Sequence, residues 1–352
     1  NRGHRVCSLM LEPLDDLPGM KATDPSDLLS QLTSFPRQIE WSKEVTFPEL
    51  PGVDNVVICG VGGSAIAGDV IIDLLSPSIP VPVIVSRNVV LPGFAGKGTL
   101  AVVVSYSGNT AESLEQYSDA LRRGCRVAVV TSGGKLEEFA IADSIPLIKV
   151  PAGNQPRASL GYLLSALALV FQRAGLGQLH DELLRAVPDL RSYIASIAPD
   201  VPYGMNQAKR LAKAMAGGVV VVYAPRQVRS VALRWQNQLN ENAKAVAFSG
   251  EVPEMDHNQL VGWLEGGKGC PCRPLLLMPS DMGPTVRRMS EVTLQMLNER
   301  GLDPVLVTLP GESLLENVLH GVALGDMASY YLAIIRGVDP APVASITEFK
   351  GR

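Results

Sequence analysis

Residues 100–124 have the pattern of a buried strand, a polar turn and a helix. The apolar run 100–104 is rich in β-branched residues, as strands covered on both faces are. A helix is expected over 111–123, where apolar residues recur at helical spacing. Asn109 and Glu112 have the spacing of a capping box, which predicts the start of that helix. A strand that leads through a short turn into a helix is the unit of an α/β fold.

The turn inside this segment, residues 105–110, reads Ser-Tyr-Ser-Gly-Asn-Thr. Free backbone N–H groups and the positive end of a helix dipole face such a turn. The hydroxyl groups of Ser105, Ser107 and Thr110 add further donors. The turn is therefore suited to an anion, with phosphate as the first choice. An ordinary strand–helix turn with Ser and Thr as caps fits this hexapeptide equally well.

Strand-like apolar runs recur along the whole chain, and helical segments alternate with them. In the first half the runs lie at 55–59, 81–85, 100–104, 127–131 and 145–150. In the second half they lie at 219–223, 245–248, 275–278 and 305–308. The alternation predicts two similar doubly wound α/β halves, each with a parallel sheet covered by helices on both faces. Only the first half carries the glycine-rich and hydroxyl-rich turns.

The chain is expected to divide into four parts. Residues 1–50 form an N-terminal helical arm, and residues 51–200 form a first α/β domain with the polar turns. Residues 201–338 form a second α/β domain, and residues 339–352 form a C-terminal tail. Within the arm, a helix at 24–43 is expected to kink or split at Pro36.

Charge and composition exclude several classes of partner. The net charge is −4 and no long basic run exists, so no nucleic-acid surface is expected. The apolar stretch 160–171 is shorter than the roughly 20 residues that span a bilayer, so it is interpreted as buried core or as a subunit interface. The five cysteines are odd in number and scattered, and no secretory signal is visible, which predicts a cytoplasmic protein.

Cys270 and Cys272 form the closest pair of cysteines. A structural metal site needs about four ligands, and no second cysteine or histidine pair has suitable spacing. The pair is therefore interpreted as part of a loop, and no metal is expected.

The turn at residues 60–65, Gly-Val-Gly-Gly-Ser-Ala, fits the dinucleotide-binding pattern Gly-x-Gly-x-x-Gly/Ala. The next strand leads to Arg87 rather than to an acid, which would suit only a 2′-phosphate, so an NADP site is one interpretation. The same turn would equally let backbone N–H groups reach a sugar. The second polar turn, at 105–110, favours a phosphosugar.

Arg157, Glu241 and His257 are the candidate catalytic side chains, and each has an ordinary alternative. Arg157 could be a surface charge, Glu241 could pair with Lys244, and His257 could be a polar surface residue. Isomerising an aldose to a ketose needs a base that moves a proton between adjacent carbons and a group that opens the sugar ring. A carboxylate and an imidazole can fill those two roles.

Several short motifs keep an order and spacing that resemble the archaeal and bacterial bifunctional phosphoglucose/phosphomannose isomerases. They are Gly63-Ser64, the turn 105–110, Pro156-Arg157-Ala158, Asn240-Glu-Asn-Ala-Lys244, His257-Asn258 and Lys350. The resemblance runs from about residue 55 to the C-terminus, and Asn-Glu-Asn followed by the His-Asn pair is its most specific part. It implies two sugar-isomerase (SIS) domains, each a flavodoxin-like α/β/α sandwich.

For substrate binding, the resemblance implies that Ser105, Ser107 and Thr110 hold the phosphate group. It implies that Gly63 and Ser64 line the sugar. A small-molecule sugar phosphate is thus the expected partner, and no cofactor is expected.

For catalysis, the resemblance implies that Glu241 moves the proton between C1 and C2. Arg157 would stabilise the negative cis-enediolate, in place of a metal. His257 and Lys350 would open the ring. Relatives of this type are dimers in which the histidine reaches the partner's site, so a homodimer with shared active sites is expected.

The implied reaction interconverts glucose 6-phosphate and fructose 6-phosphate through a cis-enediol. Many relatives carry a threonine, linked to mannose substrates, where this chain reads Pro340-Ala-Pro-Val343 without a hydroxyl. Mannose 6-phosphate therefore stays open as a second substrate. A non-catalytic SIS module that senses a phosphosugar is an alternative, but it would not need Arg157, Glu241 and His257 together. An NADP-dependent dehydrogenase built on residues 60–65 is the third interpretation.

Overall fold

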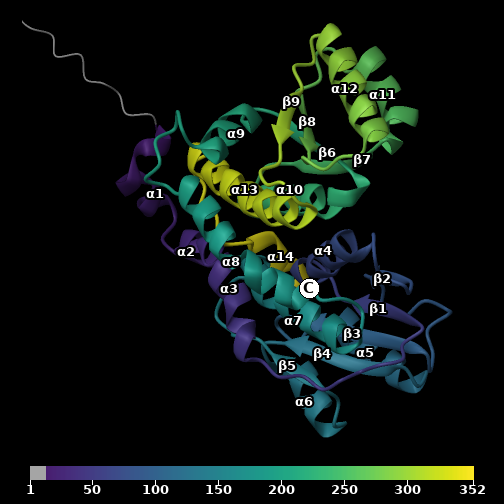
Figure 1. Cartoon of the computed structure of the whole chain (residues 1–352). Coiled ribbons are helices and arrows are strands. Elements are labelled where there is room, and N and C mark those ends of the chain that lie inside the picture. The colour runs from purple at the N-terminus through teal and green to yellow at the C-terminus, as the bar shows by residue number, and fades with distance from the viewer. Residues whose placement is uncertain (1–12) are drawn as a thin grey trace, which may run out of the picture.

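Two parallel sheets lie on opposite sides of a layer of helices (Figure 1). The computed structural model describes residues 13–352, apart from the side chain of Lys350. Most predicted strands are present within two residues of their expected ends. The prediction of two doubly wound α/β halves is confirmed.

The first sheet has five parallel strands in the order β2-β1-β3-β4-β5. They are β1 (Asn55–Cys59), β2 (Val83–Ser86), β3 (Thr99–Ser105), β4 (Arg126–Thr131) and β5 (Leu147–Lys149). Ile58 of β1 pairs with Val85 on one side and Val102 on the other. Every residue of β3 is buried, as its apolar run predicts.

The second sheet has four parallel strands in the order β7-β6-β8-β9. They are β6 (Val219–Pro225), β7 (Ala247–Val252), β8 (Cys272–Met278) and β9 (Val305–Thr308). The order repeats that of β2-β1-β3-β4, so the two halves share a topology. Cys272 begins β8, so only Cys270 of the cysteine pair lies in a loop.

The alternation of strands and long helices is interrupted at two matching connections. The chain from β2 to β3 contains no helix, and residues 87–98 form an irregular loop. In the second half, the matching connection from β7 to β8 holds only short helical turns. These are η5 (Glu254–His257), α11 (Gln259–Val261) and the π-helical η6 (Gly262–Gly266).

Four long helices form the layer between the sheets, namely α4 (Gly63–Leu75), α7 (Leu160–Arg173), α10 (Arg229–Glu241) and α13 (Leu314–Ile335). Their apolar side chains join one buried cluster that also takes in Val102 of the first sheet and Val222 of the second. The outer faces of the two sheets are covered separately, by α5 (Ala111–Arg122), α6 (Gly134–Ala142) and α12 (Pro284–Glu299). The inner helices thus serve both sheets at once.

The apolar segment 160–171 lies in α7, and all its residues except Tyr162 are buried within this single chain. The segment is core, so the alternative that it supplies a subunit interface is wrong. Among the described residues, α13 is the one helix long and apolar enough to cross a membrane, but 89% of its apolar window is buried in the protein. That burial is typical of a central core helix.

The N-terminal arm and the C-terminal tail consist of short helices. The arm contains η1 (Pro13–Asp15), α1 (Leu17–Thr23), α2 (Leu28–Thr33), α3 (Phe35–Trp41) and η2 (Ser42–Glu44). The tail contains α14 (Ala344–Gly351). The remaining helices are η3 (Pro156–Ala158), α8 (Leu179–Ser196), α9 (Gln207–Met215) and η4 (Arg226–Val228). The predicted break is confirmed, because α2 ends before Pro36 and α3 carries it in its first turn. Helix α14 is not predicted by the sequence.

A buried carboxyl group joins α4 to α10 and makes stability depend on pH. Asp73 is 3% exposed, and its Oδ2 accepts the backbone N–H of Ser230 at 2.7 Å. Burial raises the pKa of Asp73 from 3.8 to about 6. The folded state therefore keeps a proton that the unfolded chain has already lost, and stability falls as the pH rises from about 4 to 6.

Replacing Asp73 with asparagine is expected to remove this pH dependence, because the amide keeps an oxygen for Ser230 but cannot ionise. A shift of about two pKa units corresponds to about 3 kcal/mol. Urea unfolding at pH 4 and pH 7 should show that the wild type loses about 2–3 kcal/mol more than the variant across this interval. Equal losses in the two proteins would contradict the assignment.

Candidate active site

The candidate site lies at one end of two antiparallel helices, α4 and α10. At the far end, Asp73 near the end of α4 meets Ser230 in the first turn of α10. The opposite end brings together the first turn of α4, which begins at Gly63, and the last residue of α10, Glu241. Since α4 follows β1, this end also faces the carboxyl edge of the first sheet, where the polar turns lie.

The turn between β3 and α5 has the geometry of an anion site. Ser105 Oγ donates to Thr110 Oγ1 at 3.2 Å and accepts the N–H of Gly108 at 3.1 Å. Thr110 is the N-cap of α5, and its side chain makes no capping hydrogen bond to this helix. The first N–H groups of α5 are therefore left for another acceptor. Ser105 is buried, while Ser107 is exposed on the same turn.

The predicted capping box of Asn109 and Glu112 is wrong. Asn109 lies one position before the cap, and its side chain instead bonds to the Ser107 carbonyl and to the N–H of Lys135. Gly108 has φ +66°, and a Cβ there would lie 1.7 Å from the carbonyl oxygen of Gly133. The turn is thus fixed against the chain that follows β4 rather than by its own helix.

Ser64 and Gly63 connect this turn to Arg157. Ser64 Oγ accepts the N–H of Tyr106 at 3.2 Å, so the start of α4 touches the start of the polar turn. A Cβ at Gly63 would lie 3.1 Å from the carbonyl oxygen of Pro156 and 3.3 Å from the N of Arg157. Only glycine lets the two backbones approach so closely without displacement.

Arg157 and Glu241 face each other across the two halves. Arg157 Nη1 lies 3.7 Å from Glu241 Oε2, with the arginine side chain 4% exposed and the glutamate 28%. Burial lowers the pKa of Arg157, and Glu241 opposes that shift. The guanidinium group keeps its charge, since its pKa in water is far above neutral. The interpretation of Arg157 as a surface charge is therefore wrong.

Lys244 does not pair with the carboxylate of Glu241, as the alternative interpretation of Glu241 requires. Its Nζ donates instead to the backbone carbonyl groups of Glu241 at 2.9 Å and Pro340 at 3.0 Å. Arg157 Nη2 donates to the same Pro340 carbonyl and to that of Ala341, both at 2.8 Å. The C-terminal tail thus passes directly beside the Arg157–Glu241 pair.

His257 is not brought to this pair within the chain. It is the last residue of η5 and is exposed. Glu241 precedes the amino end of β7, whereas His257 follows its carboxyl end. The six residues of β7 rise by about 20 Å in all. Lys350 lies in α14, and its side chain is outside the described structure.

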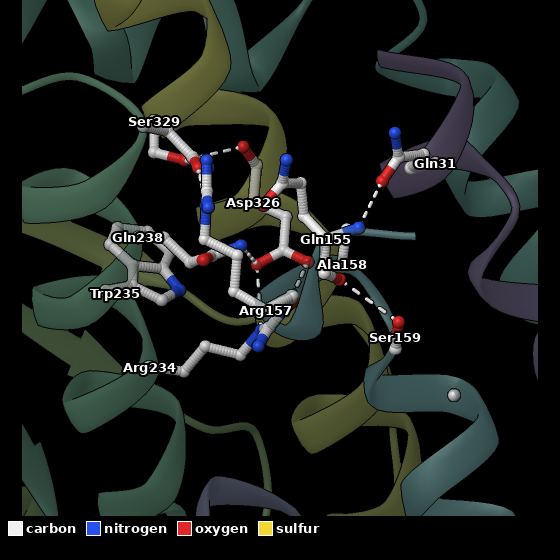
Figure 2. Close-up of polar contacts among 12 residues, drawn as sticks. Gln31, Gln155, Arg157, Ala158, Ser159, Arg234, Trp235, Gln238, Asp326 and Ser329 are labelled. Atoms are coloured by element: carbon white, nitrogen blue, oxygen red, sulfur yellow. Dashed lines mark hydrogen bonds and ion pairs between the residues drawn. The ribbon is translucent and has the colours of Figure 1, made fainter. Parts of the chain in front are cut away.

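Sequence reasoning missed a set of buried polar side chains behind Arg157, which Figure 2 shows in part. They come from α10, its C-cap and α13 and are Arg234, Gln238, Asn242, Asp326 and Ser329. A signal for two of them was present, because Asp326 and Ser329 interrupt the largely apolar second half of α13, residues 321–335. A carboxylate in such a helix needs a buried partner, and Arg234 supplies one at 2.6 Å.

The feature that favoured a dinucleotide gains no support from the geometry. Arg87, the candidate partner for a 2′-phosphate, forms an ion pair with buried Asp69 of α4. Within residues 13–352, no group of three or more His, Cys, Asp or Glu side chains could hold a metal ion. The arrangement instead combines an anion-binding turn, a carboxylate and a buried cation. Such a set can bind a phosphorylated substrate, accept a proton and stabilise negative charge.

Comparison with known proteins identifies relatives over nearly the whole chain. The family described as bacterial phospho-glucose isomerase C-terminal SIS domain matches residues 204–352. A bifunctional phosphoglucose/phosphomannose isomerase of Caldicellulosiruptor bescii is 33% identical over 339 residues, which cover 92% of this chain and 98% of that protein. The Aquifex aeolicus protein of the same name is 33% identical over 90% of this chain and 95% of its own.

A solved structure of a glucose-6-phosphate isomerase like protein from Thermus thermophilus is similar with a TM-score of 0.65. It is 20% identical, and the match covers 97% of this chain and 99% of that one. At this identity the likeness concerns the fold, and it extends through both halves.

Proposed function

The chain belongs to the family of bifunctional phosphoglucose/phosphomannose isomerases, and from this premise we propose that it interconverts glucose 6-phosphate and fructose 6-phosphate. The observation that carries the proposal is the Arg157–Glu241 pair at 3.7 Å, next to Gly63 and the polar turn 105–110. A cytoplasmic location stays a prediction, as does the use of mannose 6-phosphate.

In the proposed mechanism the turn 105–110 binds the substrate phosphate through free N–H groups of α5 and the hydroxyl groups of Ser105, Ser107 and Thr110. Glu241 takes the proton from one carbon of the C1–C2 pair and returns it to the other, so no net proton is gained or lost. Arg157 is already charged and held in place, and it stabilises the negative oxygen of the cis-enediolate.

Ring opening needs a further acid–base group, and we assign it to His257 of a second copy of the chain. The reason is geometric. His257 and Glu241 lie at opposite ends of β7, about 20 Å apart along the strand, so one copy of the chain cannot bring both to a single sugar. A homodimer with shared sites would supply the missing imidazole. Lys350, on the tail that passes Arg157, is the second proposed ring-opening group.

A phosphosugar sensor that lacks catalysis is the alternative function. A sensor needs the polar turn but has no use for a buried arginine that faces a carboxylate. Placing a partly exposed carboxylate beside Arg157 in fact weakens the attraction of this site for an anion, which favours an enzyme.

The test of the proposed function is a coupled assay with fructose 6-phosphate as substrate. Separate detection of glucose 6-phosphate and mannose 6-phosphate as products measures both activities in one reaction. The expected result is turnover to glucose 6-phosphate. Binding of the sugar phosphate without formation of either product would favour the sensor.

Ser107→Ala and Thr110→Ala are each expected to weaken phosphate binding, because each removes a hydrogen bond to a charged group, worth roughly 1.5–3 kcal/mol. Affinities for fructose 6-phosphate and inorganic phosphate should both fall by about 10- to 100-fold. Calorimetric titration measures both ligands. The assignment is contradicted if the variants lose as much affinity for unphosphorylated fructose as for its phosphate.

A further inference from the structure

The guanidinium group of Arg157 is held in one orientation by partners from the second half of the chain. Its Nε donates to Asn242 Oδ1 at 2.7 Å, and its Nη2 donates to the carbonyl groups of Pro340 and Ala341. Nη1 is the nitrogen that faces Glu241. The bonds on Nε and Nη2 therefore decide which edge of the guanidinium group points to the carboxylate.

Of these three partners of Nε and Nη2, Asn242 is the one that binds through its side chain. The side-chain amide of Asn242 is itself held at both its oxygen and its nitrogen. It is fully buried, at 0% exposure. Its Nδ2 donates to Ser329 Oγ at 2.9 Å, and Ser329 Oγ donates to the Asp326 carbonyl at 2.7 Å. The amide of Asn242 cannot rotate without breaking bonds at both ends.

The backbone of Arg157 is also held by side chains from the second half of the chain. Arg234 Nη2 donates to the Arg157 carbonyl at 2.9 Å and to Asp326 Oδ2 at 2.6 Å (Figure 2). Gln238 Nε2 adds a bond to Asp326 Oδ1 at 2.9 Å. Helices α10 and α13 thus fix both the main chain and the side chain of a residue that belongs to the first half.

We propose that Asn242, supported by Ser329, is the positioning residue for Arg157. It receives the Nε–H and so directs Nη1 towards the place where the enediolate forms. The proposal rests on the proposed function, because it assumes that Arg157 stabilises that charge. A preorganised charge acts mainly in the transition state, so loss of Asn242 should lower kcat and change KM little.

The experiment compares Asn242→Ala with a matched control, Asn317→Ala. Asn317 is also fully buried on α13, and its Nδ2 donates to two backbone carbonyl groups, but these belong to the loop after β9. Misplacement of a catalytic group by about 1 Å can cost about 10²-fold, so Asn242→Ala should lose about 10- to 100-fold in kcat. Asn317→Ala should keep the wild-type kcat in the folded fraction, which circular dichroism measures.

Three further variants make the outcomes distinct. Ser329→Ala removes the acceptor of Asn242 Nδ2 and should lower kcat, by less than Asn242→Ala does, with little change in KM. It also serves as the test if Asn242→Ala does not fold. In Arg157→Ala, adding Asn242→Ala should cause little further loss, because the residue that Asn242 positions is gone. If Arg157→Ala is impaired but Asn242→Ala matches Asn317→Ala, the positioning role is overturned and the proposed function stands. If Arg157→Ala keeps its kcat, the role of Arg157 and the positioning role of Asn242 are both overturned, whereas only a wild type without turnover would overturn the proposed function.

Discussion

Replacing Glu241 with glutamine is expected to lower kcat by about 10²–10⁴-fold, the usual loss when a general base is removed. Glutamine has the same shape and keeps the contact with Arg157, but it cannot accept a proton. KM should change little, because the carboxylate acts in the transition state and the phosphate group is bound elsewhere. Both constants come from the coupled assay with fructose 6-phosphate.

Exchange of the C2 hydrogen of glucose 6-phosphate with solvent tests the same step more directly, because fructose 6-phosphate carries no hydrogen at C2. In D₂O the wild type should place deuterium at C2 of the sugar phosphate, and Glu241→Gln should do so more slowly by the same factor as kcat. Glu182→Gln, which neutralises an exposed carboxylate on α8, is the control and should behave as the wild type. A near-normal rate of exchange in Glu241→Gln would contradict the assignment of Glu241 as the base.

Mixing two inactive variants is expected to restore about a quarter of the wild-type activity. Random exchange of Glu241→Gln and His257→Ala subunits makes half of the dimers mixed. In a mixed dimer with shared sites, one site carries both substitutions and the other carries neither. One competent site in half of the dimers gives the expected fraction.

The control for this experiment is to show that subunits have exchanged, which native mass spectrometry does if one variant carries a heavier isotope. If mixed dimers form and the activity stays at the level of the parent variants, His257 does not act across the interface. Mixing either variant with itself through the same procedure should give no recovery.

Local patterns predicted the fold well, because each strand and helix carries its own signal. The β-branched run before Ser105 and the apolar run of α7 correspond closely to β3 and to a buried helix. The alternation of these signals predicted two similar halves, and the structure added the order of the strands in each sheet. Gly63, Ser64, Arg157 and Glu241, which the motifs singled out, lie together in the structure.

What the sequence did not predict depends on contacts between distant segments. The side chain of Asn109 bonds to Lys135, beyond the next strand, instead of capping its own helix. Asn242 contacts Arg157, 85 positions earlier, and no local pattern distinguishes it from Asn240 beside it. Helix α14 is short and follows prolines, so its apolar residues give little periodicity.

The two halves of this chain cannot diverge independently in evolution. One apolar cluster includes Val102 of the first sheet and Val222 of the second, with α4, α7, α10 and α13 between them. A change in side-chain volume on any of these helices alters the packing against both sheets, because protein cores are close-packed. Recombination that exchanged one half for that of a distant relative would mismatch this shared layer. Exchange of whole chains, or of outer helices such as α6 and α12, would leave it intact.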